Sequence, residues 1–136
     1  MIKKTITYTD YNGKERTEDF YFNLTKAEAT EIEANTKGGL QEMVEQIIDA
    51  EDTASLVKIF KELILKSYGE KSADGRMFVK VDPNGYRLAD NFAQTEAYSV
   101  LFTELATDAD AAAKFFNGVI PNPEGNKTVP APASTN

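Results

Sequence analysis

Residues 2–24 read IKKTITYTDYNGKERTEDFYFNL, and this segment decides the fold because two alternating stretches flank a turn sequence. A period of two places successive side chains on opposite faces of a strand. The even-numbered positions hold most of the apolar residues: Ile2, Ile6, Tyr8, Phe20, Phe22 and Leu24. Between the stretches, Asn12-Gly13 favours the positive φ angles of a tight hairpin turn. The segment therefore predicts a β-hairpin.

A two-stranded hairpin is only marginally stable alone, so helices must cover its even-numbered face. The period changes directly after the hairpin. Thr25 and Glu28 match a capping box, in which the two side chains satisfy free backbone donors at a helix start. A helix is therefore expected from Thr25 to about Asn35, ended by Lys37-Gly38-Gly39.

Two further helices are predicted from apolar residues at helical spacing. The first has the stripe Leu40, Met43, Val44, Ile47 and Ile48. The second begins at Asp52 or Thr53 and runs to Tyr68, with Gly69 as its C-cap. Because residues 56–65 are apolar nearly all round, this second helix is expected to be central and buried.

The remaining chain to residue 121 predicts a short strand and two helices. Turn signals at 74–75 and 82–85 flank a possible strand over residues 78–81. One helix is expected from Leu88 or Asp90 to Leu105, with the stripe Ala93, Ala97, Val100, Leu101 and Leu105. The last helix follows Thr107 as N-cap, with the inner face Ala109, Ala112, Ala113 and Phe116.

These patterns predict an α+β fold that is mainly α: an N-terminal hairpin packed on a bundle of about five helices. Residues 1–121 are expected to form a single globular domain, with the hairpin over 2–24 and the helices over 25–120. Residues 122–136 are rich in Pro, Ala, Asn, Gly and Thr. Such a composition buries too little to offset its ordering entropy, so a flexible, disordered tail is expected.

The composition argues against catalysis. The chain contains no histidine, cysteine or tryptophan, which removes the usual titrating base, the ready nucleophile and most zinc sites. A Ser–Lys pair, such as Ser67 with Lys66 or Lys71, stays open. Carboxylate pairs are candidates for acid–base work, but solvation and helix capping account for them better: Glu42 with Glu45, residues 49–52, and Asp108 with Asp110. We therefore expect no enzyme and no catalytic, cofactor or metal site.

The formal net charge is −7, and the excess lies within residues 24–120, which carry 17 acidic and 10 basic side chains. Phosphate binding needs clustered Lys and Arg, so nucleic acid is not an expected partner. An acidic surface that keeps the protein soluble is one interpretation, and a surface that attracts a basic partner is the other. Charged residues interrupt the longest nearly apolar stretch, 56–65, so no membrane partner is expected.

Three aromatic residues near the last two helices are candidates for partner binding. Tyr98 and Phe102 stand four residues apart at the edge of one apolar stripe, and Phe115 falls beside the other. Either a neighbouring helix or the hairpin covers them, or they form an apolar groove that receives a helix or an unfolded segment of a partner.

Several blocks in a fixed order carry a family resemblance. They are residues 20–28 (FYFNLTKAE), Gly38-Gly39-Leu40, residues 66–72 (KSYGEKS), Asp74-Gly75-Arg76 with Phe78 and Lys80, residues 92–98, and residues 101–108. Over residues 3–121 the chain resembles small tail assembly chaperones of long-tailed bacteriophages that infect Gram-positive hosts. Residues 86–88 and the tail lie outside that pattern.

The resemblance implies a non-enzymatic protein that binds the phage tape measure protein in the cytoplasm of the infected host. It also implies a monomer or weak homo-oligomer, and a possible longer form made by ribosomal frameshifting, for which the C-terminal tail would be a linker. The alternative is a virion structural protein, such as a tail or head–tail connector subunit.

Overall fold

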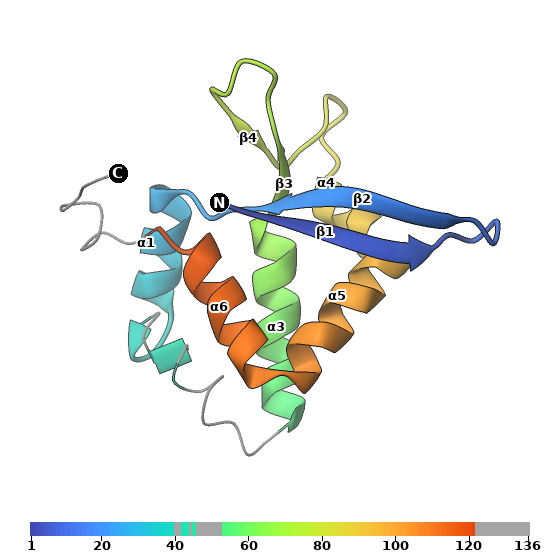
Figure 1. Cartoon of the computed structure of the whole chain (residues 1–136). Coiled ribbons are helices and arrows are strands. Elements are labelled where there is room, and N and C mark those ends of the chain that lie inside the picture. Colours follow the sequence, from blue (N-terminus) through green and yellow to red (C-terminus); the bar gives the residue numbers. More distant parts are fainter. Residues whose placement is uncertain (40–41, 44, 46–52, 122–136) are drawn as a thin grey trace, which may run out of the picture.

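The computed structural model describes residues 1–39, 42–43, 45 and 53–121. In this structure the predicted hairpin forms the N-terminal half of a β-sheet (Figure 1). Strand β1 (Ile2–Thr9) pairs antiparallel with β2 (Glu15–Phe22), in a register that places Ile2 opposite Phe22. Gly13 has a φ of 81°, as the turn prediction requires. The hairpin prediction is confirmed.

The sheet is larger than predicted, because it has four strands in the order β1-β2-β3-β4. Strand β3 (Tyr68–Lys71) pairs with β2, and β4 (Phe78–Val79) pairs with β3, both antiparallel. The expected strand at 78–81 is therefore present but shorter. Strand β3 was missed, because Tyr68 continues the apolar spacing of the helix before it.

The helices among the described residues are α1 (Lys26–Asn35), α3 (Thr53–Ser67), α4 (Leu88–Phe92), α5 (Glu96–Thr107) and α6 (Ala109–Val119). The capping box of Thr25 and Glu28 is present, and positive φ angles at Gly38 and Gly39 follow the end of α1. Of the helix predicted over 40–48, only residues 42, 43 and 45 are described, and all are helical. The predicted tail, 122–136, also lies outside the described residues.

Gly69 is not a helix C-cap, which corrects the sequence prediction. The chain passes directly from α3 into β3, and Gly69 pairs with Tyr21. A Cβ atom at position 69 would lie 2.6 Å from both the Phe78 ring and the Val79 carbonyl oxygen. Glycine is therefore required by the close approach of β4, not by a left-handed turn.

Two helix boundaries were also wrong. The single helix expected from 88 or 90 to 105 is broken between α4 and α5, because the Thr95 hydroxyl donates to the Phe92 carbonyl and accepts from the Tyr98 amide. The N-cap of α6 is Asp108, whose carboxylate accepts from two backbone amides, while Thr107 ends α5. In both places a local side-chain hydrogen bond sets the boundary.

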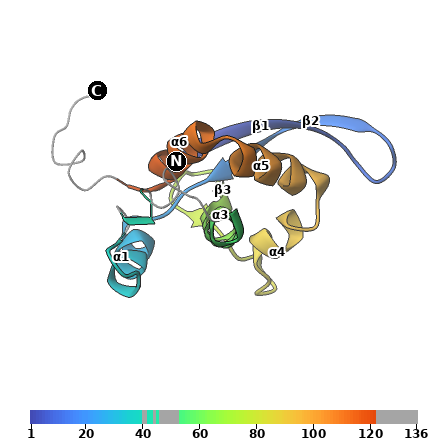
Figure 2. The same cartoon turned by 90° about the horizontal axis from the view of Figure 1, so that it is seen from below.

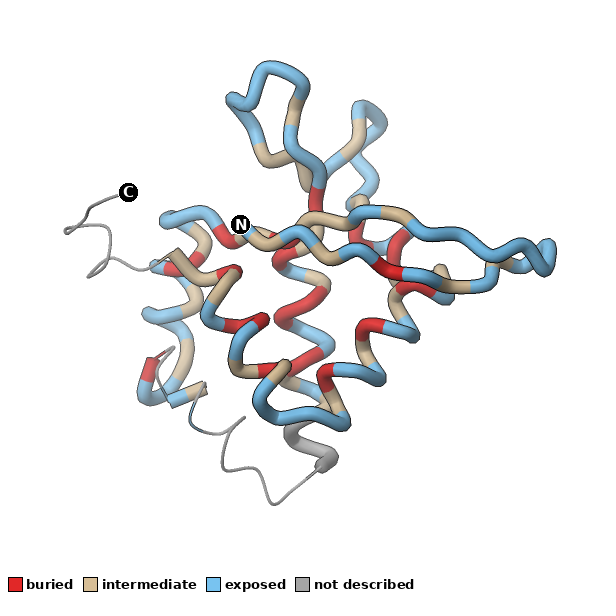
Figure 3. Tube along the Cα trace, in the orientation of Figure 1, coloured by how far each residue is buried: buried red, intermediate tan, exposed pale blue. Residues whose placement is uncertain are grey.

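The core lies between the even-numbered face of the hairpin and helices α3, α5 and α6. Seen from below, α5 and α6 lie against β1 and β2, with α3 beside them (Figure 2). Buried residues recur along α3, α5 and α6, and β1 and β2 each contribute one, whereas β4 contributes none (Figure 3). The large fully buried side chains are Phe22, Leu24, Phe60, Ile64, Leu101, Leu105, Phe116 and Val119. Val100 and Ala109, which were assigned to inner faces, are exposed because they point away from this centre.

One aromatic cluster joins β2 to the helices. Phe22 contacts Tyr68, Phe92 and Phe115 edge-on, with ring centroids 5.2–5.7 Å apart. Tyr68 and Phe92 stack with centroids 4.3 Å apart. Such ring contacts stabilise the fold beyond the contribution of the apolar area that the rings bury.

Among the described residues, every helix is too short or too polar to span a membrane.

We predict that Leu101→Asp lowers the free energy of unfolding by about 3–5 kcal/mol, because it buries an unpaired carboxylate in the core. Leu101 is fully buried, whereas its neighbour Val100 is 43% exposed. Val100→Asp is therefore the matched control and should cost under about 1 kcal/mol. Denaturant unfolding of both variants measures this, and equal losses would contradict the assignment of the core face of α5.

Candidate partner-binding groove

The three aromatic residues proposed from the sequence do not form one surface. Phe115 is only 3% exposed and packs against Phe22 of β2, so of the two alternatives given for it, cover by the hairpin is the one observed. The reason is that α6 buries Ala112, Phe115, Phe116 and Val119 together. Tyr98 and Phe102 are half-buried on α5, with ring centroids 5.7 Å apart. Their contact with a partner stays a prediction.

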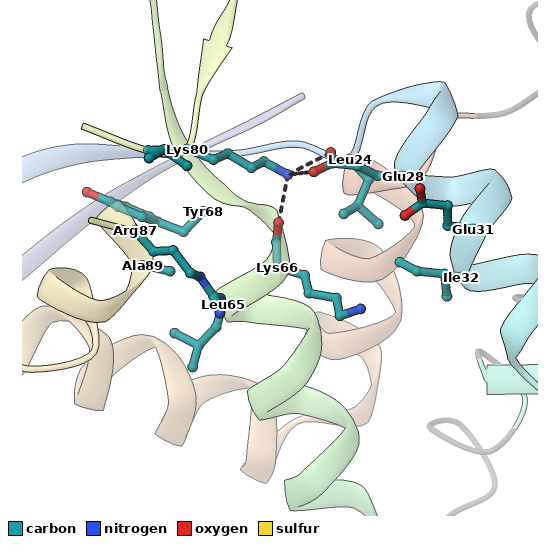
Figure 4. A pocket seen from close by; sticks show the side chains of 11 residues that line it. Leu24, Glu28, Glu31, Ile32, Leu65, Lys66, Tyr68, Lys80, Arg87 and Ala89 are labelled. Atoms are coloured by element: carbon teal, nitrogen blue, oxygen red, sulfur yellow. Dashed lines mark hydrogen bonds and ion pairs between the residues drawn. The ribbon is translucent and has the colours of Figure 1, made fainter. Parts of the chain in front are cut away.

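A hollow lies instead between α1 and α3, and we call it the α1–α3 groove (Figure 4). Its larger cavity, of about 340 Å³, is lined by Leu24, Glu28, Glu31, Ile32, Leu65, Lys66, Tyr68, Lys80, Val81, Arg87 and Ala89. An adjoining cavity of about 240 Å³ shares Glu31, Ile32 and Lys66 and adds Asn35, Thr36, Met43, Glu62 and Leu63. The groove therefore combines an apolar floor with a charged rim along the length of α1.

The composition of α1 explains why the groove is open. Its sequence, KAEATEIEAN, offers Ile32 as the only large apolar side chain. Ala29 is buried and Ile32 is half-buried, while most of the helix is exposed. A helix with so little apolar surface cannot cover its neighbour closely. The floor of the groove on α3 and β3 is left partly accessible as a result.

A charged cluster closes one end of the groove. The Lys80 ammonium lies 2.7 and 2.8 Å from the two carboxylate oxygens of Glu28, and it donates to the Lys66 carbonyl at 2.6 Å (Figure 4). That carbonyl belongs to the last turn of α3, where a cation also meets the negative end of the helix dipole. One Glu28 oxygen accepts from the Thr25 amide as well. The cluster thus ties the start of α1 to the end of α3.

This cluster also changes the ionisation of Glu28. Partial burial disfavours its carboxylate, but the hydrogen bonds from Lys80 and from the Thr25 backbone outweigh that effect. The pKa of Glu28 is therefore held below its ordinary value of 4.5. The carboxylate stays ionised and paired through the neutral range.

The other charged side chains at the rim are not paired in this way. Arg87 lies beside α4, Lys66 projects from the end of α3 toward α1, and Glu31 projects from α1 (Figure 4). Within the described part of the chain, none of the three forms an ion pair at 4.0 Å or less. They are exposed and available to a charged ligand.

Two of the residues considered for catalysis, Ser67 and Asp108, have structural roles. The Ser67 hydroxyl is fully buried and donates to the Ile64 carbonyl. Asp108 caps α6, and Glu42 and Glu45 are exposed. Residues 49–52 lie outside the described residues. Across the described ranges, no group of three or more acidic side chains could hold a metal ion.

The groove itself is not predictable from the local sequence patterns. Glu28 was noted for the capping box and Lys80 within a family block. Arg87 was noted only as part of residues 86–88, and Ile32 was not singled out. The one usable signal was the weak amphipathicity of residues 26–35, which indicates a helix that cannot bury a full face. The pairing of Glu28 with Lys80 joins residues 52 positions apart, and no local pattern encodes it.

The family model described as phage tail assembly chaperone matches residues 1–128. The chain belongs to this family, which confirms the resemblance noted in its sequence. No curated protein and no solved structure matches the chain.

We predict that Glu28→Gln lowers the free energy of unfolding by about 1–2 kcal/mol at pH 7. Glutamine can keep the capping box, so the loss reports mainly the contact with Lys80. Because the pKa of Glu28 is lowered in the folded state, its contribution is present above pH 4.5 and is lost as the pH falls through the folded pKa. The difference between the variant and the parent chain should therefore shrink in acid.

Glu31→Gln on the same helix is the control, since Glu31 forms no ion pair in the described part. Denaturant unfolding between pH 7 and pH 3 measures both variants. A difference for Glu28→Gln that does not change with pH, or an equal loss for Glu31→Gln, would contradict the role of the cluster.

Proposed function

We propose that this chain binds the phage tape measure protein during tail assembly and shields its apolar helices until the tail tube replaces the chaperone. Family membership supports a role in tail assembly. The observation that carries the finer proposal is the α1–α3 groove, with its apolar floor and charged rim. A groove of this kind suits the apolar stripe of an amphipathic helix.

The proposed binding is weak and multivalent. Many small copies can coat one long chain, and each can leave when a tube subunit arrives, because each contact is small. Lightly packed α1 suits this role, since it can shift to admit side chains of different size. Half-buried Tyr98 and Phe102 on α5 are proposed as a second, smaller contact.

Residues 1–121 act as one globular unit, as a monomer or weak homo-oligomer in the cytoplasm of the infected host. A longer, frameshifted form of the chain is a second partner. The chain works without a cofactor and is not an enzyme, in keeping with a family of chaperones.

A virion structural subunit is the second candidate, because the eight-residue strand β1 stands at an edge of the sheet. An edge strand can pair with a strand of a neighbouring subunit. Mass spectrometry of purified particles separates the two candidates. A chaperone should be absent from finished particles, whereas a structural subunit should be present in fixed stoichiometry.

We predict that co-expression with this chain keeps the tape measure protein soluble and that Ile32→Asp removes most of this effect. The carboxylate would stand on the apolar floor of the groove, where a partner side chain would leave it unpaired. Ala34→Asp is the matched control, because Ala34 is exposed on the same helix and lines neither cavity. The soluble fraction of the tape measure protein is the readout.

Two outcomes would count against the proposal. An insoluble tape measure protein in the presence of the parent chain would refute the chaperone function. Full activity of Ile32→Asp, with a melting temperature like that of Ala34→Asp, would refute the groove as the binding surface.

A further inference from the structure

We propose that the α1–α3 groove is charge-polarised and selects amphipathic helices of a partner protein that carry carboxylates beside one end of their apolar stripe. Lys66 and Arg87 are the residues that bind those carboxylates. This inference rests on the proposed function, because it names the chemistry by which the same groove chooses segments of its partner.

The shape of the groove defines what can enter it. The larger cavity, of about 340 Å³, has room for a few aliphatic side chains but not for a helix backbone. Its apolar floor comes from Leu24, Ile32, Leu65, Tyr68 and Ala89. The two cavities together follow α1 from Glu28 to Thr36. An elongated apolar floor of this kind fits side chains at positions i, i+3, i+4 and i+7 of a helix laid across the surface.

The charges of the rim differ between its two ends. Arg87 lines only the larger cavity, where it ends beside Leu65, and Lys66 projects from α3 toward Ile32 and borders both cavities (Figure 4). Glu62 lines only the smaller cavity, and Glu31 borders both. Apart from the Lys80–Glu28 pair, the larger cavity therefore has two cations to one carboxylate, and the smaller cavity has the reverse. Lys80 and Glu28 neutralise each other, so they do not alter this division. The groove therefore has a basic end next to α4 and an acidic end next to Met43.

The two cations of the larger cavity that are unpaired in the described part of the chain, Lys66 and Arg87, suit a carboxylate ligand. Neither forms an ion pair within the described ranges. The guanidinium of Arg87 can hold a carboxylate through two parallel hydrogen bonds. A charge beside an apolar floor interacts more strongly than one in bulk water, because the local dielectric constant is lower. Carboxylates next to the apolar stripe of a bound helix would meet both cations.

The preference of the groove for carboxylates is opposite to the preference for basic partners that the net charge favours. A chain with a formal net charge of −7 attracts basic partners at long range. Local recognition by Lys66 and Arg87 favours an acidic end instead. A preference for carboxylates would therefore identify the groove and not the overall field.

The test uses two synthetic helical peptides of equal length with leucines at i, i+3, i+4 and i+7. The first carries glutamates beside the stripe in one half and lysines in the other, and the second carries lysines in both halves. The parent chain should bind the first peptide roughly five- to tenfold more tightly by fluorescence anisotropy, as expected for two rim ion pairs. Equal binding, tighter binding of the second peptide, or no binding of either would overturn the proposal.

Variants locate the preference. Lys66→Gln with Arg87→Gln should abolish it, and Lys66→Glu with Arg87→Glu should invert it. The matched control is Lys58→Glu with Lys61→Glu, which changes the net charge equally on exposed positions of α3 outside both cavities. The control should keep the preference of the parent chain. Inversion by the control would assign the effect to net charge and overturn the proposal, and melting curves verify that each variant is folded.

The soluble fraction of the co-expressed tape measure protein is measured separately with the same parent chain. A soluble tape measure protein without a preference for the first peptide would refute this inference and leave the proposed function standing. An insoluble tape measure protein would refute the proposed function whatever the peptides show.

Discussion

The aromatic contact between strand β2 and the helices is the interaction on which the rest of the structure depends. Phe22 is fully buried and touches Tyr68, Phe92 and Phe115, which come from β3, α4 and α6. The hairpin has a single apolar face and cannot persist without this cover. Because one side chain meets three elements, the position of the hairpin fixes where β3, α4 and α6 can lie. Strand β3 begins directly after α3, because α3 ends where the chain reaches β2 and pairs with it.

The packing around this cluster leaves α1 at the margin. The chain enters α1 directly after Leu24, and its helix has one large apolar side chain to offer. Packing therefore holds α1 only lightly, and the ion pair of Glu28 with Lys80 supplies the link to the end of α3. This ion pair can position α1 without filling the space between α1 and α3. The α1–α3 groove is the consequence, and it is the surface on which the proposed function rests.

Much of the architecture could be predicted from local patterns. Alternation over residues 2–24 predicted the hairpin, the pair Thr25 and Glu28 predicted the start of α1, and the apolar spacing around Leu101 predicted its burial. These features depend on neighbours a few residues apart, so a single sequence contains their signal. The family resemblance also depends on short sequence blocks in a fixed order, and the family match over residues 1–128 confirms it.

The sequence by itself determined that this is a helical protein with an N-terminal hairpin, built without the residues that most catalytic sites use. Only the tertiary structure decided that Gly69 lies in a strand, that Phe115 is buried and that Glu28 meets Lys80. The physical reason is that each of these outcomes depends on contacts between distant segments. The identity of such neighbours is fixed by how the whole core packs, and no local period or spacing carries it.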